Sequence, residues 1–123
     1  MVDIATVRRV ALAMTDVDDR SDEGRIALEV RGGKGLAWTY LKREAPKKPR
    51  VAQPDALAVR CDLARKEMLI AAAPNRFFDD DHYRGFPAIL VRLPAVDEDE
   101  LAALLQDAWR LSAPKALLKG RLD

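Results

Sequence analysis

Two stretches of alternating apolar residues flank Gly32-Gly33, and this pattern restricts the fold more than any other in the 123-residue chain. Successive side chains of a strand point to opposite faces of a sheet, so such alternation is typical of strands that bury one face. Adjacent glycines supply the permissive backbone of a tight turn. The pattern therefore predicts an antiparallel β-hairpin. Its alternating residues are Ile26, Leu28 and Val30 before the turn, and Leu36, Trp38 and Tyr40 after it.

The rest of the chain contains further strand patterns, separated by polar segments. A third strand is expected over residues 55–61, and the strongly apolar segment 87–93 is expected to form another. Residues 15–24 are polar and acidic, and residues 43–54 hold three prolines, so we expect both segments to be exposed loops. Residues 77–86 are expected to be irregular or to form a short edge strand.

Helical periodicity marks the remaining segments. Helices are expected over residues 3–14, over residues 62–73, from Asp97 to about Ser112, and from Pro114 to about Gly120. Asp3 and Asp62 are the expected N-caps of the first two helices. Asp97 and Glu100 have the spacing of a capping box. The inward stripe of that helix comprises Leu101, Leu104, Leu105, Ala108 and Ser112, flanked by Trp109.

The order of these elements predicts the fold class. Strands joined by hairpins form antiparallel sheets, and helices cover the faces that such sheets bury. We therefore expect an α+β protein with an antiparallel sheet of four or five strands and helices packed on one face. A chain of 123 residues suits one domain, which would span residues 1–123.

Cysteine usage and hydropathy bear on the cellular compartment. The chain has one cysteine, Cys61, so an internal disulfide is excluded and a reducing compartment is the simplest interpretation. Cys61 ends a predicted apolar strand, where we expect a buried, inert thiol. No segment approaches the ~20 apolar residues that span a bilayer, and the polar N-terminus does not resemble a signal peptide. We expect a cytoplasmic monomer that does not associate with membranes.

The balance of charges argues against binding nucleic acid through bulk charge. The chain carries 21 Lys and Arg residues against 20 Asp and Glu residues, whereas such proteins usually carry a large positive excess. A local basic cluster provides another route, because its field attracts phosphates. The cluster comprises Lys42, Arg43, Lys47, Lys48 and Arg50, opposed by Glu44, with Arg84, Arg110 and Lys115 as further candidate phosphate contacts. Alternatively, the cluster is a solvated loop that keeps the protein soluble.

The segment His82–Phe86 is a second candidate site. It combines polar, aromatic and cationic side chains just before a predicted buried strand. Its aromatic rings suit stacking on a base or lining a pocket. The other interpretation is that Tyr83 and Phe86 cover an edge of the core. As a small-molecule or protein-binding site, it would comprise Trp38, His82, Tyr83, Arg84, Phe86 and Trp109.

No catalytic constellation is apparent in the sequence. His82 is the only histidine and has no neighbouring nucleophile, so general acid–base and nucleophilic chemistry lack partnered groups. The run Asp79–Asp81 lacks the ligand spacing of a calcium loop, so we expect a solvated acidic loop. The segment Gly32–Gly35 lacks the spacing of a phosphate-binding loop and precedes a strand rather than a helix. We therefore expect a non-enzymatic binding protein with no metal or cofactor.

Several motifs resemble the MmcQ/YjbR family. In the C-terminal half these motifs are Asn75–Phe78, His82–Leu93 and Asp107–Lys115, in the order and spacing of the family. Upstream, Val7–Leu12 and Gly33-Lys34 followed by Ala37-Trp38 fit its N-terminal part. The resemblance covers nearly the whole chain.

This resemblance implies a twisted antiparallel sheet with helices on one side, similar to that of CyaY, the bacterial frataxin homologue. Members of the family are largely of unknown function, and they are often described as predicted DNA-binding proteins with a double-wing arrangement of hairpins. For a nearly neutral chain, this implies weak and strongly salt-dependent DNA binding. The analogy with frataxin leaves a metal carrier based on Asp79–Asp81 as a further alternative.

Overall fold

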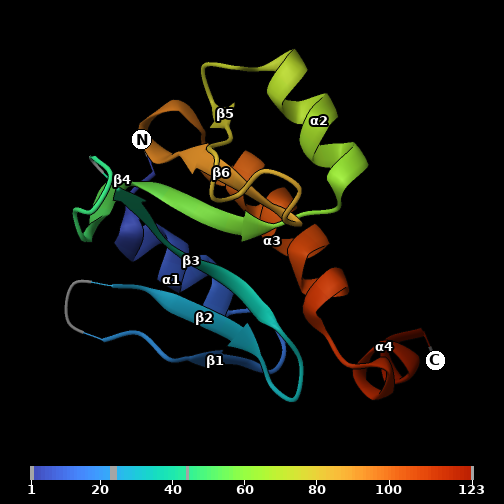
Figure 1. Ribbon diagram of the computed structural model, residues 1–123. Coiled ribbons are helices and arrows are strands. Elements are labelled where there is room, and N and C mark those ends of the chain that lie inside the picture. Colours follow the sequence, from blue (N-terminus) through green and yellow to red (C-terminus); the bar gives the residue numbers. More distant parts are fainter. Residues whose placement is uncertain (1, 23–24, 44, 123) are drawn as a thin grey trace.

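The computed structural model describes residues 2–22, 25–43 and 45–122 (Figure 1). The helices are α1 (Ile4–Leu12), α2 (Leu63–Ala72), α3 (Glu98–Ser112) and α4 (Lys115–Leu122), with the 3-10 helix η1 (Leu93–Ala95). The strands are β1 (Val17–Asp19), β2 (Ala27–Val30), β3 (Gly35–Arg43), β4 (Arg50–Arg60), β5 (Phe77–Phe78) and β6 (Ala88–Arg92). None of the described helices is long and apolar enough to cross a membrane.

The described strands form one sheet in the order β1-β2-β3-β4-β6-β5. Every neighbouring pair in this sheet is antiparallel. The predicted α+β class and antiparallel sheet are confirmed, whereas the predicted strand number was wrong, because the sheet built from described residues has six strands. The predicted hairpin across Gly32-Gly33 is the β2–β3 pair.

The two faces of the sheet are covered differently. Helices α1 and α3 pack on one face, and α2 lies beside β5 and β6 at one edge (Figure 1). Alternation along β4 and β6 divides their side chains: Leu57 and Ile89 enter the core under the helices, whereas Ala58 and Leu90 face the other side. We call this other side the open face, because the segment 79–87 covers part of it in place of a helix.

The helix starts follow the predicted capping. The side chain of Asp3 accepts a hydrogen bond from the Thr6 amide, and that of Asp62 accepts one from the Arg65 amide. Asp97 forms the predicted capping box with Glu100. The predicted inward stripe of α3 is buried throughout, and Trp109 is buried beside it.

The predicted loop 43–54 was wrong over residues 50–54, because β4 begins at Arg50, whereas residues 45–49 form the turn between the strands. Leu41 pairs with Ala52 and Thr39 with Leu57, so β4 carries extra residues opposite this part of β3. Pro54 lies within this bulge, where a residue without an amide hydrogen costs the sheet no ladder hydrogen bond.

The predicted loop 15–24 contains the edge strand β1, and its residues 23–24 lie outside the described part of the chain. Asp18 and Asp19 give β1 low intrinsic strand propensity, which is why its sequence reads as a loop. Arg31 forms ion pairs with Asp16 and Asp18 across this edge. Charges on an edge strand also hinder pairing with other chains.

Candidate functional site

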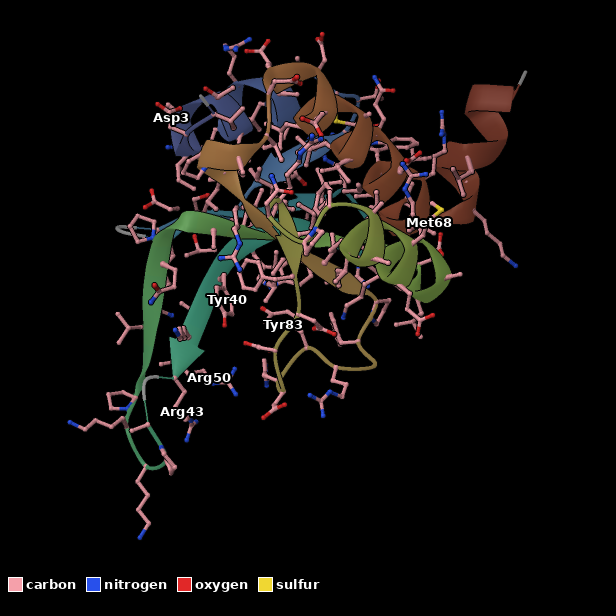
Figure 2. All side chains as sticks on the ribbon, turned by 90° about the horizontal axis from the view of Figure 1, so that it is seen from above. Asp3, Tyr40, Arg43, Arg50, Met68 and Tyr83 are labelled. Atoms are coloured by element: carbon pink, nitrogen blue, oxygen red, sulfur yellow. The ribbon has the colours of Figure 1, made fainter. Side chains whose placement is uncertain are left out.

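The open face carries an aromatic cluster on β3, β5 and the segment 79–87. Trp38 and Tyr40 alternate along β3 and point to this side of the sheet (Figure 2 shows Tyr40). The indole Nε1 of Trp38 donates a hydrogen bond to the Tyr83 hydroxyl at 2.9 Å. The rings of Trp38 and Phe86 meet edge to face, with their centroids 6.3 Å apart. These contacts fasten the segment 79–87 onto the sheet.

Lys66 of α2 also binds the segment 79–87. This lysine is only 3% exposed, which is unusual for an ammonium group. Its Nζ atom donates hydrogen bonds to the carbonyls of Tyr83, at 2.7 Å, and Phe86, at 3.1 Å. It also lies 3.1 Å from a carboxylate oxygen of Asp79. Lys66 therefore adds a second donor to two carbonyls that already accept backbone amide hydrogen bonds, from Phe86 and Ala88, and it neutralises one of the three consecutive aspartates.

Asp80 and Asp81 are engaged as well. The hydroxyl of Tyr40 donates a hydrogen bond to Asp80 Oδ2 at 2.6 Å, and the other oxygen of this carboxylate accepts one from the Tyr83 amide. Burial, together with this carboxylate, raises the pKa of Tyr40. Asp81 forms an ion pair with Arg84. The triple aspartate thus builds the loop rather than presenting three free carboxylates.

The described residues include no group of three or more histidine, cysteine or carboxylate side chains arranged to hold a metal ion. The separate engagement of Asp79, Asp80 and Asp81 accounts for this, because their side chains turn toward different partners. Cys61 is 4% exposed, as predicted, and burial raises the pKa of its thiol to about 11. So high a pKa leaves little of the nucleophilic thiolate at neutral pH.

The predicted small-molecule or protein-binding site joined Trp109 to Trp38 and the segment His82–Phe86, and the structure does not bring Trp109 to that segment. Trp109 lies in the core on the helix-covered face of the sheet, and its indole nitrogen donates to the carbonyl of Thr15. Trp38 and Tyr83 lie on the open face with Phe86, where their rings pack on one another. Trp38, Tyr83 and Phe86 do not line the two grooves described below, whereas His82 lines one of them. His82 and Arg84 are exposed on the outer side of the loop.

The basic cluster lies on the β3–β4 hairpin, which projects from the body of the protein (Figure 2). Arg43 and Arg50 form the last described strand pair before its tip. Lys42, Arg43, Lys47 and Lys48 are exposed, and no described carboxylate forms an ion pair with them. Glu44, expected to oppose the cluster, lies outside the described residues.

Arg50 connects the hairpin to the segment 79–87. Its guanidinium lies 2.8 Å from Nδ1 of His82, which implies that this ring nitrogen is unprotonated and accepts the hydrogen bond. Arg84 stands on the same segment, exposed and paired with Asp81. The hairpin and the loop therefore form two neighbouring walls.

Arg110 and Lys115 lie at the other end of β3. The amide of Lys34, next to the first residue of β3, donates a hydrogen bond to the carbonyl of Ser112, between these two cations in sequence. The nine residues of β3 span about 27 Å at ~3.4 Å per residue. Arg110 and Lys115 are therefore not part of the surface formed by the hairpin cations.

Two grooves lie between the walls of the open face. The first, which we call the sheet groove, has a volume of about 630 Å³ and runs over Tyr40, Ala56, Phe78 and Arg92. The second, the hairpin groove, has a volume of about 560 Å³ and is lined by Arg43, Arg50 and His82. Lys42, Tyr40 and Asp80 line both grooves, so the grooves adjoin at the hydrogen bond between Tyr40 and Asp80.

Comparison with known proteins assigns the chain to a family. The sequence profile described as YjbR matches residues 11–111. The chain belongs to the YjbR family. The uncharacterized proteins Mb2600 of Mycobacterium bovis and Rv2570 of Mycobacterium tuberculosis are each 35% identical over 98 residues, which cover 74% of this chain and 76% of the relative.

A solved structure resembles this YjbR chain in fold. The crystal structure of Deinococcus radiodurans protein DR2400, a DUF419 domain, superimposes with a TM-score of 0.66 at 20% sequence identity. The match covers 90% of this chain and 78% of the Deinococcus chain. At this level of identity, the likeness shows a shared fold alone.

Two residues of the site are absent from the sequence-based predictions. Lys66 stands in a helix, where a lysine normally indicates an exposed position. Arg92 follows Ala88 and Leu90 at alternate positions of β6, a spacing that places it on the open face. This alternation is the signal that would have found Arg92, whereas no local pattern marks Lys66.

Proposed function

We propose that this YjbR protein is a nucleic-acid-binding module that contacts phosphates through the β3–β4 hairpin, and that it acts by binding rather than by catalysis. The observation that supports this is the set of exposed cations on a projecting hairpin, Lys42, Arg43, Lys47 and Lys48, which have no described carboxylate partner. A two-stranded ribbon is narrow enough to follow a groove of a duplex or the backbone of a single strand.

The charges near the hairpin favour phosphate binding despite the formal net charge of +1. The carboxylates of Asp79 and Asp81 form ion pairs with Lys66 and Arg84, and Asp80 accepts the Tyr40 hydroxyl hydrogen. The two ion pairs reduce the field that Asp79 and Asp81 exert at a distance, whereas Asp80 and the hairpin cations keep theirs. We expect a weak interaction, with a dissociation constant of about 10⁻⁴–10⁻⁶ M at physiological salt.

Lys47 and Lys48 lie at the tip of the hairpin, where they would contact phosphates. The double substitution Lys47→Gln/Lys48→Gln removes two phosphate contacts, so the slope of log affinity against log salt should become shallower by about 1.8 on duplex DNA. Fluorescence anisotropy with a labelled duplex, from low to physiological salt, measures this slope.

The matched control is Arg110→Gln/Lys115→Gln, which removes the same charge from the opposite end of β3 and should leave the slope unchanged. An unchanged slope for the hairpin variant would contradict the proposal. So would the absence of any binding at ~100 μM protein in low salt, where non-specific binders are close to saturation.

A further inference from the structure

The sheet groove lies beside the proposed phosphate-binding hairpin, and its lining differs in chemistry from the hairpin. Its apolar residues include Pro54, Ala56, Phe78 and Pro94. Arg92 and Lys42 supply cations at its sides. These apolar side chains suit a planar organic group better than a phosphate, and the polar residues of the same lining can contact the edges of such a group.

Arg92 supplies a stacking surface in this groove. Its guanidinium lies over the ring of Phe78, 4.2 Å from the centroid, so one face of the guanidinium is covered. Arg92 is exposed and lines the groove, which leaves the other face available to a second planar group. No described carboxylate forms an ion pair with it. Arginine planes and aromatic rings are the surfaces on which proteins stack unpaired bases.

Two of the three carboxylates in the groove lining already have partners within the protein. Asp79 lies against Lys66, and Asp80 is held by Tyr40. Asp55 is exposed at the rim, where its carboxylate can accept a hydrogen bond from the exocyclic amine of a base. Lys42 lines both grooves, so it stands where a phosphate attached to a base in the sheet groove would meet the hairpin cations.

We propose that the sheet groove holds an unstacked base of single-stranded nucleic acid, against Phe78 and Arg92, while the hairpin contacts the adjoining phosphates. This inference rests on the proposed function and makes it more specific. A duplex keeps its bases stacked and paired, so it reaches the hairpin but cannot place a base in the groove without an unstacking cost. The protein therefore binds a single strand more tightly than a duplex of the same length.

The substitution Arg92→Lys tests the stacking contact, because it keeps the charge and removes the planar guanidinium. Single-strand affinity should fall about fivefold or more, in line with the loss of one stacked base. Duplex affinity and both salt slopes should stay as in the wild type. Arg9→Lys, on the exposed side of α1, is the matched control and should change neither affinity. Fluorescence anisotropy with a 12-nucleotide strand and with its duplex measures the two affinities and the two salt slopes.

A second variant checks the groove without touching Arg92. Ala95→Leu adds bulk at an exposed position of the groove lining and should weaken single-strand binding alone. Equal wild-type affinity for strand and duplex, or unchanged single-strand affinity in Arg92→Lys, would overturn the groove inference while leaving the hairpin proposal intact. The absence of binding to either nucleic acid would overturn both.

Discussion

Replacing Lys66 with methionine is expected to lower the free energy of unfolding by about 3 kcal/mol, close to the cost of breaking a buried ion pair by removing one partner. The substitution removes one of the two donors to each of the Tyr83 and Phe86 carbonyls, which keep their backbone amide partners, and it leaves the carboxylate of Asp79 without its cation. Each group then loses a partner in a site that water reaches poorly. Breaking a buried ion pair costs about 3–5 kcal/mol. We expect the lower value here because the Asp79 side chain is 29% exposed.

Urea denaturation of Lys66→Met measures this loss. Lys34→Met changes an exposed lysine in the same way and should stay within about 0.5 kcal/mol of the wild type. The double variant Lys66→Met/Asp79→Asn should recover part of the loss, because it removes the unpaired carboxylate but leaves the two carbonyls. A Lys66→Met protein as stable as Lys34→Met would show that the lysine does not hold the segment 79–87.

Replacing Gly33 with alanine is expected to cost about 3 kcal/mol, at the upper end of what overpacking costs. A Cβ atom at Gly33 would lie 2.0 Å from the carbonyl oxygen of Ser112, and this backbone atom cannot move aside without shifting α3. The same carbonyl accepts a hydrogen bond from the Lys34 amide at 2.8 Å. The substitution therefore forces apart the β2–β3 turn and the C-terminal end of α3.

Gly85→Ala is the control for this substitution. Gly85 has a φ of +77°, yet a Cβ atom there would meet nothing within 4 Å. Alanine at Gly85 should cost only about 1 kcal/mol, from the left-handed backbone alone. Thermal or urea denaturation ranks the two variants. A smaller loss for Gly33→Ala than for Gly85→Ala would contradict the close approach of the turn to Ser112.

The features that the sequence predicted correctly depend on neighbouring residues. Capping by Asp97 and Glu100, the inward stripe of α3 and the turn at Gly32-Gly33 each follow from spacing within a few positions. Strand β1 and the first half of β4 were not predicted, because their formation depends on pairing with distant parts of the chain. The acidic sequence of β1 is typical of a loop, and it forms a strand only because it pairs at the edge of the sheet. Pro54 is also typical of a loop, and β4 accommodates it only because it lies in a bulge.

In the candidate site, too, features set by local sequence could be predicted and features set by the tertiary structure could not. The exposure of Lys47 and Lys48 could be predicted, since a charged, proline-containing segment is solvated wherever it lies. The position of Trp109 on the helix-covered face could not, because it depends on how α3 crosses the sheet. The burial of Lys66 depends on a loop whose path only the complete fold defines.

We propose that the open face, together with the projecting hairpin, is the nucleic-acid-binding surface of this protein. Mapping of amide chemical shifts in ¹⁵N-labelled protein during titration with a 12-nucleotide single strand tests it most directly. The perturbed amides are expected to lie in residues 38–43, 45–56 and 78–95. Perturbations concentrated in α1, α3 or α4, with the hairpin unchanged, would contradict it.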